Sequence, residues 1–399
     1  MNSRPKQSAE GQRSFKGTPH LFQPYEILFS GFSNSGKTSL ISNLVRILSR
    51  KYLIGYVKHA AHSFGMDHEG KDTDRVRRSG AKTVFISSPD QAALLSAGTF
   101  DFVRQRSMVS DCELLLVEGH KDIPGRRILL IDRSARVLEA HRVNGFDDVL
   151  AFVGPRENPA PDLLPHHVPY FHRDRIDAIA DFVEELIKVE TEKVPLCGLV
   201  LAGGYSTRMK KDKALLTYHG STQVEATFDL VSDLCDRTFV SCRKGQLETG
   251  RVSRLPQIHD RLIDFGPVGG LLSAMVEYPK SAWLVVACDL PYLDKDTVAA
   301  LVSNRRPLKF ATVYDSALDG LPEPLCAIYE PGMRQKMFES LGWGHESLRK
   351  VLLNSNVKRL KPARDLALEN VNDLTEYRKA TNYFQTALRC GRVQSGKVN

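Results

Sequence analysis

The chain has 399 residues with a formal net charge of +8, and 42% of the residues are hydrophobic and 26% charged. At about 150 residues per domain, this length predicts two or three globular domains of ordinary composition. The seven cysteines are scattered without a C-x-x-C pair, which argues against a disulfide framework or a zinc site. No apolar run approaches the about 18 residues of a membrane helix, and the N-terminus has no signal-like apolar core. We therefore expect a cytoplasmic protein with no membrane partner.

Both ends of the chain are polar and basic. Residues 1–21 are predicted to form a disordered tail, and residues 389–399 a second, frayed tail. A basic balance can indicate nucleic-acid binding, but no nucleic-acid module or interleaved aromatic and basic stretch is visible. We interpret the charge as solvated tails together with cations for nucleotide phosphates, and we expect no nucleic-acid partner.

Strand-like and helix-like segments alternate over residues 22–189. Short apolar runs typical of strands occur at residues 27–29, 53–57, 83–86, 114–117 and 128–131. The spacing of apolar residues predicts one helix over residues 39–48 and another over residues 174–189. This alternation predicts an α/β domain, in which a parallel sheet is covered by helices.

Residues 31–38 lie between the first predicted strand and the first predicted helix, and they fit the G-x-x-x-x-G-K-[ST] phosphate loop. The loop amides and the helix N-terminus would hold a β-phosphate, Lys37 would reach the β- and γ-phosphates, and Thr38 would bind Mg²⁺. The nucleotide-binding residues that this loop supplies are Gly31, Ser33, Asn34, Ser35, Gly36, Lys37 and Thr38.

Glu118 directly follows the apolar run at residues 114–117. An acid at the end of a buried strand is a candidate partner for the Mg²⁺ or the attacking water of the loop, and the alternative is a strand-end acid with no ligand. His59 and His62 stand three residues apart, which suits a metal pair. Because no third ligand is evident, we favour contact with phosphate or with a partner.

A polar segment at residues 190–195 is predicted to be a linker, and residues 196–388 repeat the alternation of strands and helices. An apolar run at residues 199–202 stops at Gly203 and Gly204, which let the backbone turn sharply and present N–H groups to a phosphate. Arg208 and Lys213 then supply two cations that could neutralise a triphosphate. The pattern predicts a second nucleotide site, in which the α-phosphorus is attacked.

Further apolar runs in this half occur at residues 238–241, 283–287, 310–313 and 326–328. Asp289 follows the second of them, and an acid at the carboxyl end of a strand is well placed to hold Mg²⁺ against phosphates; the alternative is an acid that caps the turn before Pro291. Asp260 precedes a glycine-rich segment. Its carboxylate could accept the N1–H and the 2-amino group of guanine, although an isolated Asp of this kind is more often a surface acid.

The C-terminal half resembles the molybdenum cofactor guanylyltransferases over essentially all of residues 196–388. The motifs that carry the resemblance are Leu201-Ala202-Gly203-Gly204-x-Ser206-x-Arg208-Met209, Asp212-Lys213-Ala214-Leu215, Gly266-Pro267-x-Gly269-Gly270, Cys288-Asp289-x-Pro291, Pro322-x-Pro324-Leu325 and Asn370-Val371-Asn372. The chain departs from the family at Lys210, where glycine is usual.

This resemblance implies a Rossmann-like nucleotidyltransferase domain and assigns roles to its residues. The GTP-binding residues would be Leu201, Ala202, Gly203, Gly204, Lys213, Asp260 and Asp289. Arg208, Lys213 and Asp289 would be catalytic. Asp289 would bind Mg²⁺, with Asn372 as a weaker second ligand candidate.

The N-terminal half resembles the adaptor, protein B, of molybdopterin-guanine dinucleotide biosynthesis over about residues 25–188. The resemblance rests on the phosphate loop and on the motifs Val57-Lys58-His59-x-x-His62, Gly70-Lys71-Asp72-Thr73, Arg77-x-x-Gly80-Ala81 and Val117-Glu118-Gly119-x-Lys121. It implies a P-loop domain that binds GTP, hydrolyses it slowly and assists the transferase. It further implies molybdoenzymes or their chaperones, and molybdenum insertion proteins, as partners, and a homodimer formed through this half.

Taken together, the two resemblances predict a fusion enzyme that transfers GMP from GTP to molybdenum-molybdopterin and releases pyrophosphate. Two alternatives stay open at this point. The substrate could be another phosphorylated compound, such as a sugar phosphate, or the product could be the cytidine form of the cofactor. The chain could also be a regulatory GTPase whose transferase-like half only binds ligands.

Overall fold

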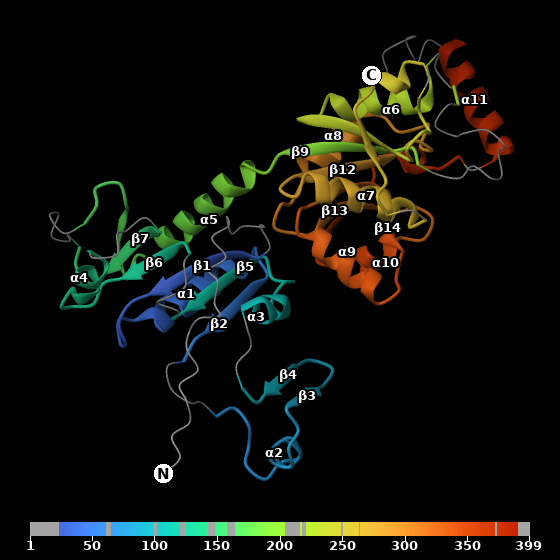
Figure 1. The fold of residues 1–399 in the computed structure, drawn as a ribbon. Helices are drawn as coiled ribbons and strands as arrows, with labels where there is room; N and C mark the ends of the chain where they lie inside the picture. Colours follow the sequence, from blue (N-terminus) through green and yellow to red (C-terminus); the bar gives the residue numbers. More distant parts are fainter. Residues whose placement is uncertain are drawn as a thin grey trace.

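The computed structural model describes residues 24–60, 65–98, 102–119, 125–142, 148–157, 164–203, 216–217, 221–248, 250–262, 264–371 and 373–389. These residues form two α/β halves, each built around one sheet (Figure 1). Within the described residues, no helix is both long enough and apolar enough to cross a bilayer.

The N-terminal sheet has six parallel strands in the order β2-β5-β1-β6-β7-β8. Its strands are β1 (Tyr25–Ser30), β2 (Ile54–Lys58), β5 (Leu114–Glu118), β6 (Arg127–Leu130), β7 (Val149–Gly154) and β8 (Tyr170–His172). The helices of this half are α1 (Lys37–Leu48), α2 (Asp72–Arg78), α3 (Phe102–Met108), α4 (Arg136–Arg142) and α5 (Ile176–Glu192). The parallel α/β sheet that the sequence predicts is confirmed.

Apolar spacing explains why α1 and α5 pack on this sheet. The buried residues of α1 are Leu40, Ile41, Leu44 and Leu48, and those of α5 are Ile179, Ala180, Val183 and Ile187. They recur three or four residues apart, so each set forms one face. Both faces join a single core cluster with residues of the central strands.

The predicted strand at residues 83–86 exists, but its expected place in the parallel sheet was wrong. β3 (Thr83–Ser87) pairs antiparallel with β4 (Ala92–Ser96) in a separate two-stranded sheet. The intervening turn is short, which favours a hairpin over a crossover to a parallel neighbour. The hairpin lies apart from the main sheet, near α2 (Figure 1), and its residue Phe85 is 66% exposed.

The C-terminal sheet has seven strands in the order β11-β10-β9-β12-β14-β13-β15, and β14 runs antiparallel to both of its neighbours. The strands are β9 (Leu196–Leu201), β10 (Arg237–Cys242), β11 (Gln257–His259), β12 (Ala282–Ala287), β13 (Ala311–Asp315), β14 (Pro322–Tyr329) and β15 (Val357–Leu360). The other pairs are parallel, so β9, β10, β11 and β12 end at one edge.

Two core clusters cover the two faces of this sheet. One contains residues of α6 (Gln223–Ser232) and α8 (Lys295–Ser303). The other contains residues of α7 (Gly266–Glu277), α9 (Met333–Gly342) and α10 (Leu348–Leu353). A smaller cluster packs α11 (Leu374–Arg389) against Tyr292. The described residues of this half also include two short 3₁₀ segments, Val252–Arg254 and Asp365–Leu368.

The two halves are joined by side-chain contacts as well as by the short connection from α5 to β9. Lys309 lies 2.9 Å from Glu113, and Lys336 lies 2.8 Å from Asp111. Leu308 of the C-terminal half belongs to the core cluster of the N-terminal half. Among the described residues, these contacts form one junction between the two halves.

The junction involves the amino ends of strands in both halves. Glu113 directly precedes β5, and Lys309 precedes β13 by two residues. Asn356, which directly precedes β15, donates a hydrogen bond to the carbonyl of Asp111 at 3.5 Å. The carboxyl ends of the parallel strands therefore lie at the far side of each half (Figure 1).

Candidate functional sites

The phosphate loop connects β1 to α1, as its sequence predicts. Gly36 is the N-cap of α1 and has a φ of 89°, a left-handed conformation that favours glycine. At Gly31 the reason for glycine is space, because a Cβ there would lie 2.8 Å from Ser35 Oγ and 2.9 Å from Leu130 O. Ser33 and Asn34 are exposed, whereas Ser35 is buried.

Lys37 folds back over the loop. Its Nζ donates to the carbonyls of Gly31 at 3.1 Å and Phe32 at 2.8 Å. These carbonyl contacts place the ammonium above the loop, where the helix N-terminus already favours anions. The arrangement suits a β- or γ-phosphate.

Glu118 at the end of β5 is the centre of a polar network. Thr38 Oγ1 lies 3.0 and 2.9 Å from its two carboxylate oxygens, Tyr56 donates at 2.7 Å, and Lys58 Nζ lies at 3.5 Å. Burial raises the pKa of Glu118, but the hydrogen bonds from Tyr56 and Thr38 and the charge of Lys58 outweigh it, so the pKa falls below its ordinary value. The carboxylate and the Thr38 hydroxyl together form a hard oxygen pair suited to Mg²⁺.

The structure places the two predicted histidines differently. The N–H of His59 donates to the carbonyl of Glu118 at 2.9 Å, so its backbone lies next to the loop acid. His62 lies outside the described residues. Among the described residues, no group of three or more His, Cys, Asp or Glu side chains could hold a metal.

The second predicted site lies at the shared edge where β9, β10, β11 and β12 end. Leu201, Ala202 and Gly203 continue β9, and the Ala202 N–H donates to the Ser241 carbonyl at 2.9 Å. Asp260 follows β11 and Asp289 follows β12. Residues predicted from separate motifs thus gather at one edge of the sheet, where open α/β sheets bind ligands.

Close packing orients Asp260. Ser241, which is 1% exposed, donates from Oγ to Asp260 Oδ1 at 2.7 Å. A Cβ at Gly203 would lie 2.9 Å from Asp260 Oδ2, and one at Gly270 would lie 2.4 Å from Ser241 Oγ. Burial raises the pKa of Asp260, although the Ser241 hydrogen bond acts in the opposite direction. Two glycines and one serine therefore position this carboxylate against the end of β9.

Asp289 has a second acid in its vicinity. The carbonyl of Asp289 accepts from the Val371 N–H at 2.9 Å, which fixes the strand end to the segment before Asn372. Glu323, at the start of β14, is 8% exposed, and burial raises its pKa; the negative charge of Asp289 adds to this rise. Glu323 also receives a contact from Arg349 Nη2 at 3.3 Å.

Several predicted residues cannot be placed. Gly204, Arg208, Lys210, Lys213 and Asn372 lie outside the described residues. Their predicted contacts with the triphosphate and with Mg²⁺ therefore stay predictions.

Sequence reasoning missed Tyr56, Ser241 and Glu323. Tyr56 lies two residues before Lys58 on β2, and because alternate strand residues share a face, both can meet Glu118 on the paired strand β5. Ser241 ends a predicted strand, and Glu323 is the variable residue of Pro322-x-Pro324. The signals for these residues were weak because each depends on a neighbour far away in the sequence.

The family models match the two halves separately. Residues 27–154 match the model described as molybdopterin guanine dinucleotide synthesis protein B, and residues 198–360 match the MobA-like NTP transferase domain. The two matched regions cover the phosphate loop of the first half and the β9 to β12 edge of the second. Both predicted resemblances are confirmed.

Individual relatives agree with these matches. A molybdenum cofactor biosynthesis bifunctional protein of Synechocystis sp. is 35% identical over 190 residues, which make up 48% of this chain and 55% of that protein. The chain thus matches about half the length of that relative. The crystal structure of Bacillus subtilis MobB is similar to 40% of this chain and 98% of its own, at 21% identity and a TM-score of 0.31.

This chain matches almost the whole length of a shorter relative. A probable molybdenum cofactor guanylyltransferase of Mycobacterium marinum is 30% identical over 188 residues, which are 46% of this chain and 92% of that protein. The glycine turn after β9, Asp260 and Asp289 lie in the half that matches the MobA-like model. The chain belongs to the molybdenum cofactor guanylyltransferase family and carries, in the same polypeptide, an N-terminal MobB domain.

Proposed function

We propose that this chain transfers GMP from GTP to molybdenum-molybdopterin, forming the guanine dinucleotide cofactor and pyrophosphate. One observation carries the proposal: in a member of this family, Gly203, Asp260 and Asp289 follow the carboxyl ends of β9, β11 and β12 along one edge of the sheet. This edge offers a glycine turn for phosphates, a carboxylate for a base and a carboxylate for a metal. A guanine nucleotide needs all three.

The chemistry proposed for this site needs no protein nucleophile. The terminal phosphate of the pterin substrate attacks the α-phosphorus of GTP, and pyrophosphate leaves. The backbone of Leu201, Ala202, Gly203 and Gly204 would position the triphosphate in line with the attacking oxygen. Arg208 and Lys213 would neutralise charge that builds up on the phosphates.

Asp260 would select guanine. Guanine presents two adjacent donors, N1–H and the 2-amino group, and an ionised carboxylate accepts both. Cytosine and adenine lack that donor pair, so the contact favours GTP over CTP and ATP. The hydrogen bond from Ser241 leaves Asp260 Oδ2 directed at the glycine turn, which supports this role.

The residues at the edge also fit Mg²⁺, which supplies charge neutralisation to phosphate transfer when bound. Asp289 would hold it, because a carboxylate at a strand end is the type of oxygen ligand that this ion prefers. Glu323 is a second carboxylate close enough to influence Asp289 electrostatically. Asn372, which follows the segment bonded to Asp289, is the weaker candidate.

For the N-terminal half we propose GTP binding at the phosphate loop, with weak GTP hydrolysis. Lys37 would contact the β- and γ-phosphates, and Thr38 and Glu118 would hold Mg²⁺ or orient water. Molybdoenzymes or their chaperones, and molybdenum insertion proteins, would receive the product. A homodimer through this half, and a cytoplasmic location, complete the proposal.

Product analysis tests the proposal with the full chain. The purified protein is incubated with Mg²⁺, molybdenum-molybdopterin and GTP, CTP or ATP in turn, and the dinucleotide and pyrophosphate are quantified separately. We expect the dinucleotide with GTP alone. A cytidine product would support the alternative cofactor, and a sugar-phosphate acceptor replacing the pterin would support the other substrate class.

A Lys37→Ala chain, run in parallel, separates the two halves. We expect it to lose nucleotide binding at the phosphate loop and any GTP hydrolysis, because the cation at the β- and γ-phosphates is removed. Dinucleotide formation should persist. Phosphate release without dinucleotide from the unaltered chain would instead favour a regulatory GTPase.

A further inference from the structure

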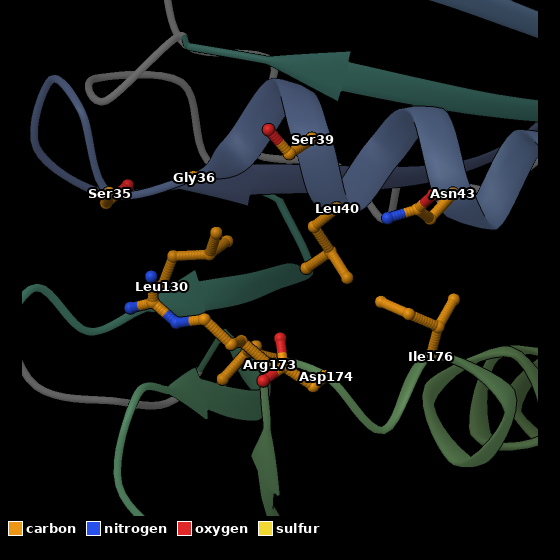
Figure 2. Close-up of a pocket in the computed structure, with 10 residues that line it drawn as sticks. Ser35, Gly36, Ser39, Leu40, Asn43, Leu130, Arg173, Asp174 and Ile176 are labelled. Carbon is orange, nitrogen blue, oxygen red and sulfur yellow. The ribbon is translucent and has the colours of Figure 1, made fainter.

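A cavity of about 270 Å³ lies beside the phosphate loop, between α1 and the corner that joins β8 to α5 (Figure 2). Its floor and walls include the apolar side chains of Leu40, Leu130, Val153 and Ile176. Its polar lining comes from Ser35, Gly36, Ser39, Asn43, Arg173 and Asp174. The volume is close to the lower limit of about 300 Å³ for small-molecule sites, which excludes large ligands.

Two polar atoms at this cavity lack partners. Ser35 is 3% exposed, and its Oγ has no hydrogen-bond partner among the described residues. The buried Nε of Arg173 likewise has none within the described part of the chain. Burying such groups without partners is costly, and a ligand in the cavity would offset that cost.

The corner that carries Arg173 and Asp174 is firmly built. The Arg173 N–H donates to the Gly154 carbonyl at 2.9 Å, and the Arg175 N–H donates to the His172 carbonyl at 3.0 Å. His172 Nε2 lies 3.1 Å from the carbonyl of Pro155, so the side chain ties the ends of β7 and β8 together. The backbone that positions the two side chains is therefore pre-organised.

The Arg173 side chain reaches toward the phosphate loop. In Figure 2 it extends from the corner toward Ser35 and Gly36, and Asp174 lies beside it. A Cβ at Gly36 would lie 3.8 Å from Arg173 Nη1. The cavity thus continues directly from the site where a nucleotide's phosphates would bind to a pair of opposite charges.

We propose that this cavity binds the nucleoside of the nucleotide whose phosphates occupy residues 31–38, and that Arg173 and Asp174 make the site select guanine. Guanine presents acceptors at O6 and N7, which match a guanidinium, and donors at N1 and N2, which match a carboxylate. Adenine presents an amino donor where O6 would be and no 2-amino group. The inference rests on the proposed GTP binding by the N-terminal half.

The decisive variant is Asp174→Asn, which keeps the size of the side chain and turns one acceptor into a donor. Xanthine has a carbonyl oxygen where guanine has its 2-amino group, so the amide should accept xanthosine triphosphate. Calorimetric titration of the full chain with GTP, xanthosine triphosphate and ATP measures binding at each site, and the Lys37→Ala chain identifies the isotherm of the phosphate loop. For that isotherm we expect GTP affinity to fall roughly ten- to a hundredfold and xanthosine triphosphate affinity to rise.

Asp177→Asn is the matched control, because Asp177 is an exposed acid of α5 outside the cavity lining. It removes the same charge and should bind all three nucleotides as the unaltered chain does. Equal effects of the two variants, or a loop isotherm with no preference for GTP over ATP, would overturn the inference. If the unaltered chain shows no Lys37-dependent isotherm, then the proposed GTP binding itself fails. A thermal melt of Asp174→Asn that matches that of the unaltered chain separates lost recognition from loss of folding.

Discussion

The glycine-containing turns of the two halves adjoin carboxylates that are held in different ways. In the N-terminal half, Thr38, Tyr56 and Lys58 converge on Glu118 through polar side-chain contacts. In the C-terminal half, Ser241 is the one side-chain donor to Asp260 among the described residues, and two glycines make room for the carboxylate by close packing. Both carboxylates follow the same topological rule, because each stands at or just after the carboxyl end of a parallel strand.

The difference teaches what each site tolerates. A carboxylate within a polar network has its pKa lowered and stays ionised, as Glu118 does. A carboxylate seated by packing has its pKa raised by burial, as Asp260 does, and it depends on the absence of two Cβ atoms. The Glu118 site should therefore lose ligand binding when one of its polar partners is removed. The Asp260 site should lose ligand binding when a side chain is added at one of the two glycines, or when the pH falls.

The largest effect that we predict is on transfer at the C-terminal site. Asp289→Asn should lower dinucleotide formation by about a thousandfold or more, because a metal-held charge is worth several kcal/mol of transition-state stabilisation. Steady-state assays over a range of Mg²⁺ concentrations measure the loss. Asp296→Asn, at an exposed position of α8, is the control and should stay active. Near-normal turnover by Asp289→Asn would remove this carboxylate from the proposed site.

Arg305 tests a buried ion pair within the C-terminal half. It forms a two-armed ion pair with Glu330, at 2.7 and 2.9 Å, and donates to the Val194 carbonyl at 3.2 Å. Arg305→Ala should lower the free energy of unfolding by about 3–5 kcal/mol, because Glu330 is 1% exposed and would keep an unpaired buried charge.

Urea unfolding measures this loss, and Lys295→Ala is the control. Lys295 pairs with Asp233 at 2.8 Å on the surface, so its loss should cost at most about 1 kcal/mol. Equal effects of the two changes would mean that the buried pair adds nothing beyond a surface contact.

Gly270→Ala adds volume at the packed site. Its Cβ would meet Ser241 Oγ, so the change should cost about 1–3 kcal/mol of stability and raise KM for GTP by displacing Asp260. Gly342→Ala, where no atom lies within 4 Å of the added Cβ, should be neutral or gain up to about 1 kcal/mol. Steady-state kinetics of both variants measure KM for GTP, and thermal melts measure their stability. An unchanged KM in Gly270→Ala would show that Ser241 does not position Asp260 for the nucleotide.

The smallest effect concerns pH. Only the ionised carboxylate of Asp260 can accept both guanine donors, and burial raises its pKa above the ordinary Asp value. As the pH falls through this raised pKa, KM for GTP should rise, and the rise should begin at a higher pH than an ordinary Asp would give. Asp260→Asn cannot titrate and should show a higher KM without this component. Parallel pH profiles for the two chains would contradict the assignment.

Local patterns predicted much of the fold and part of each site. The strand-end positions of the phosphate loop, Glu118 and Asp289 could be predicted because a strand, a turn and a charged residue are adjacent in the sequence, and the roles of these residues stay predictions. The same reasoning misplaced β3, since an apolar run of four residues does not reveal whether its partner lies in a parallel sheet or a hairpin. β8 and β11, with three residues each, are too short for a periodic pattern.

Contacts between distant residues account for the rest of what was missed. Tyr56 meets Glu118 across 62 positions, and the register of β2 against β5 decides that contact. Glu323 comes near Asp289 because β14 runs antiparallel to β12. The Arg173 and Asp174 corner depends on the short strand β8, so the cavity beside α1 had no sequence signal.

Because the amino ends of the strands meet at the junction, a ligand that moved between the two proposed sites would have to pass along the strands of both halves. Two six-residue strands such as β1 and β9, laid end to end, span on the order of 40 Å. A nucleotide that the phosphate loop released would therefore enter bulk water before it reached the β9 to β12 edge of its own chain. Direct transfer of a ligand between the two proposed sites would therefore join different molecules, and the single polypeptide supplies the two domains in equal numbers.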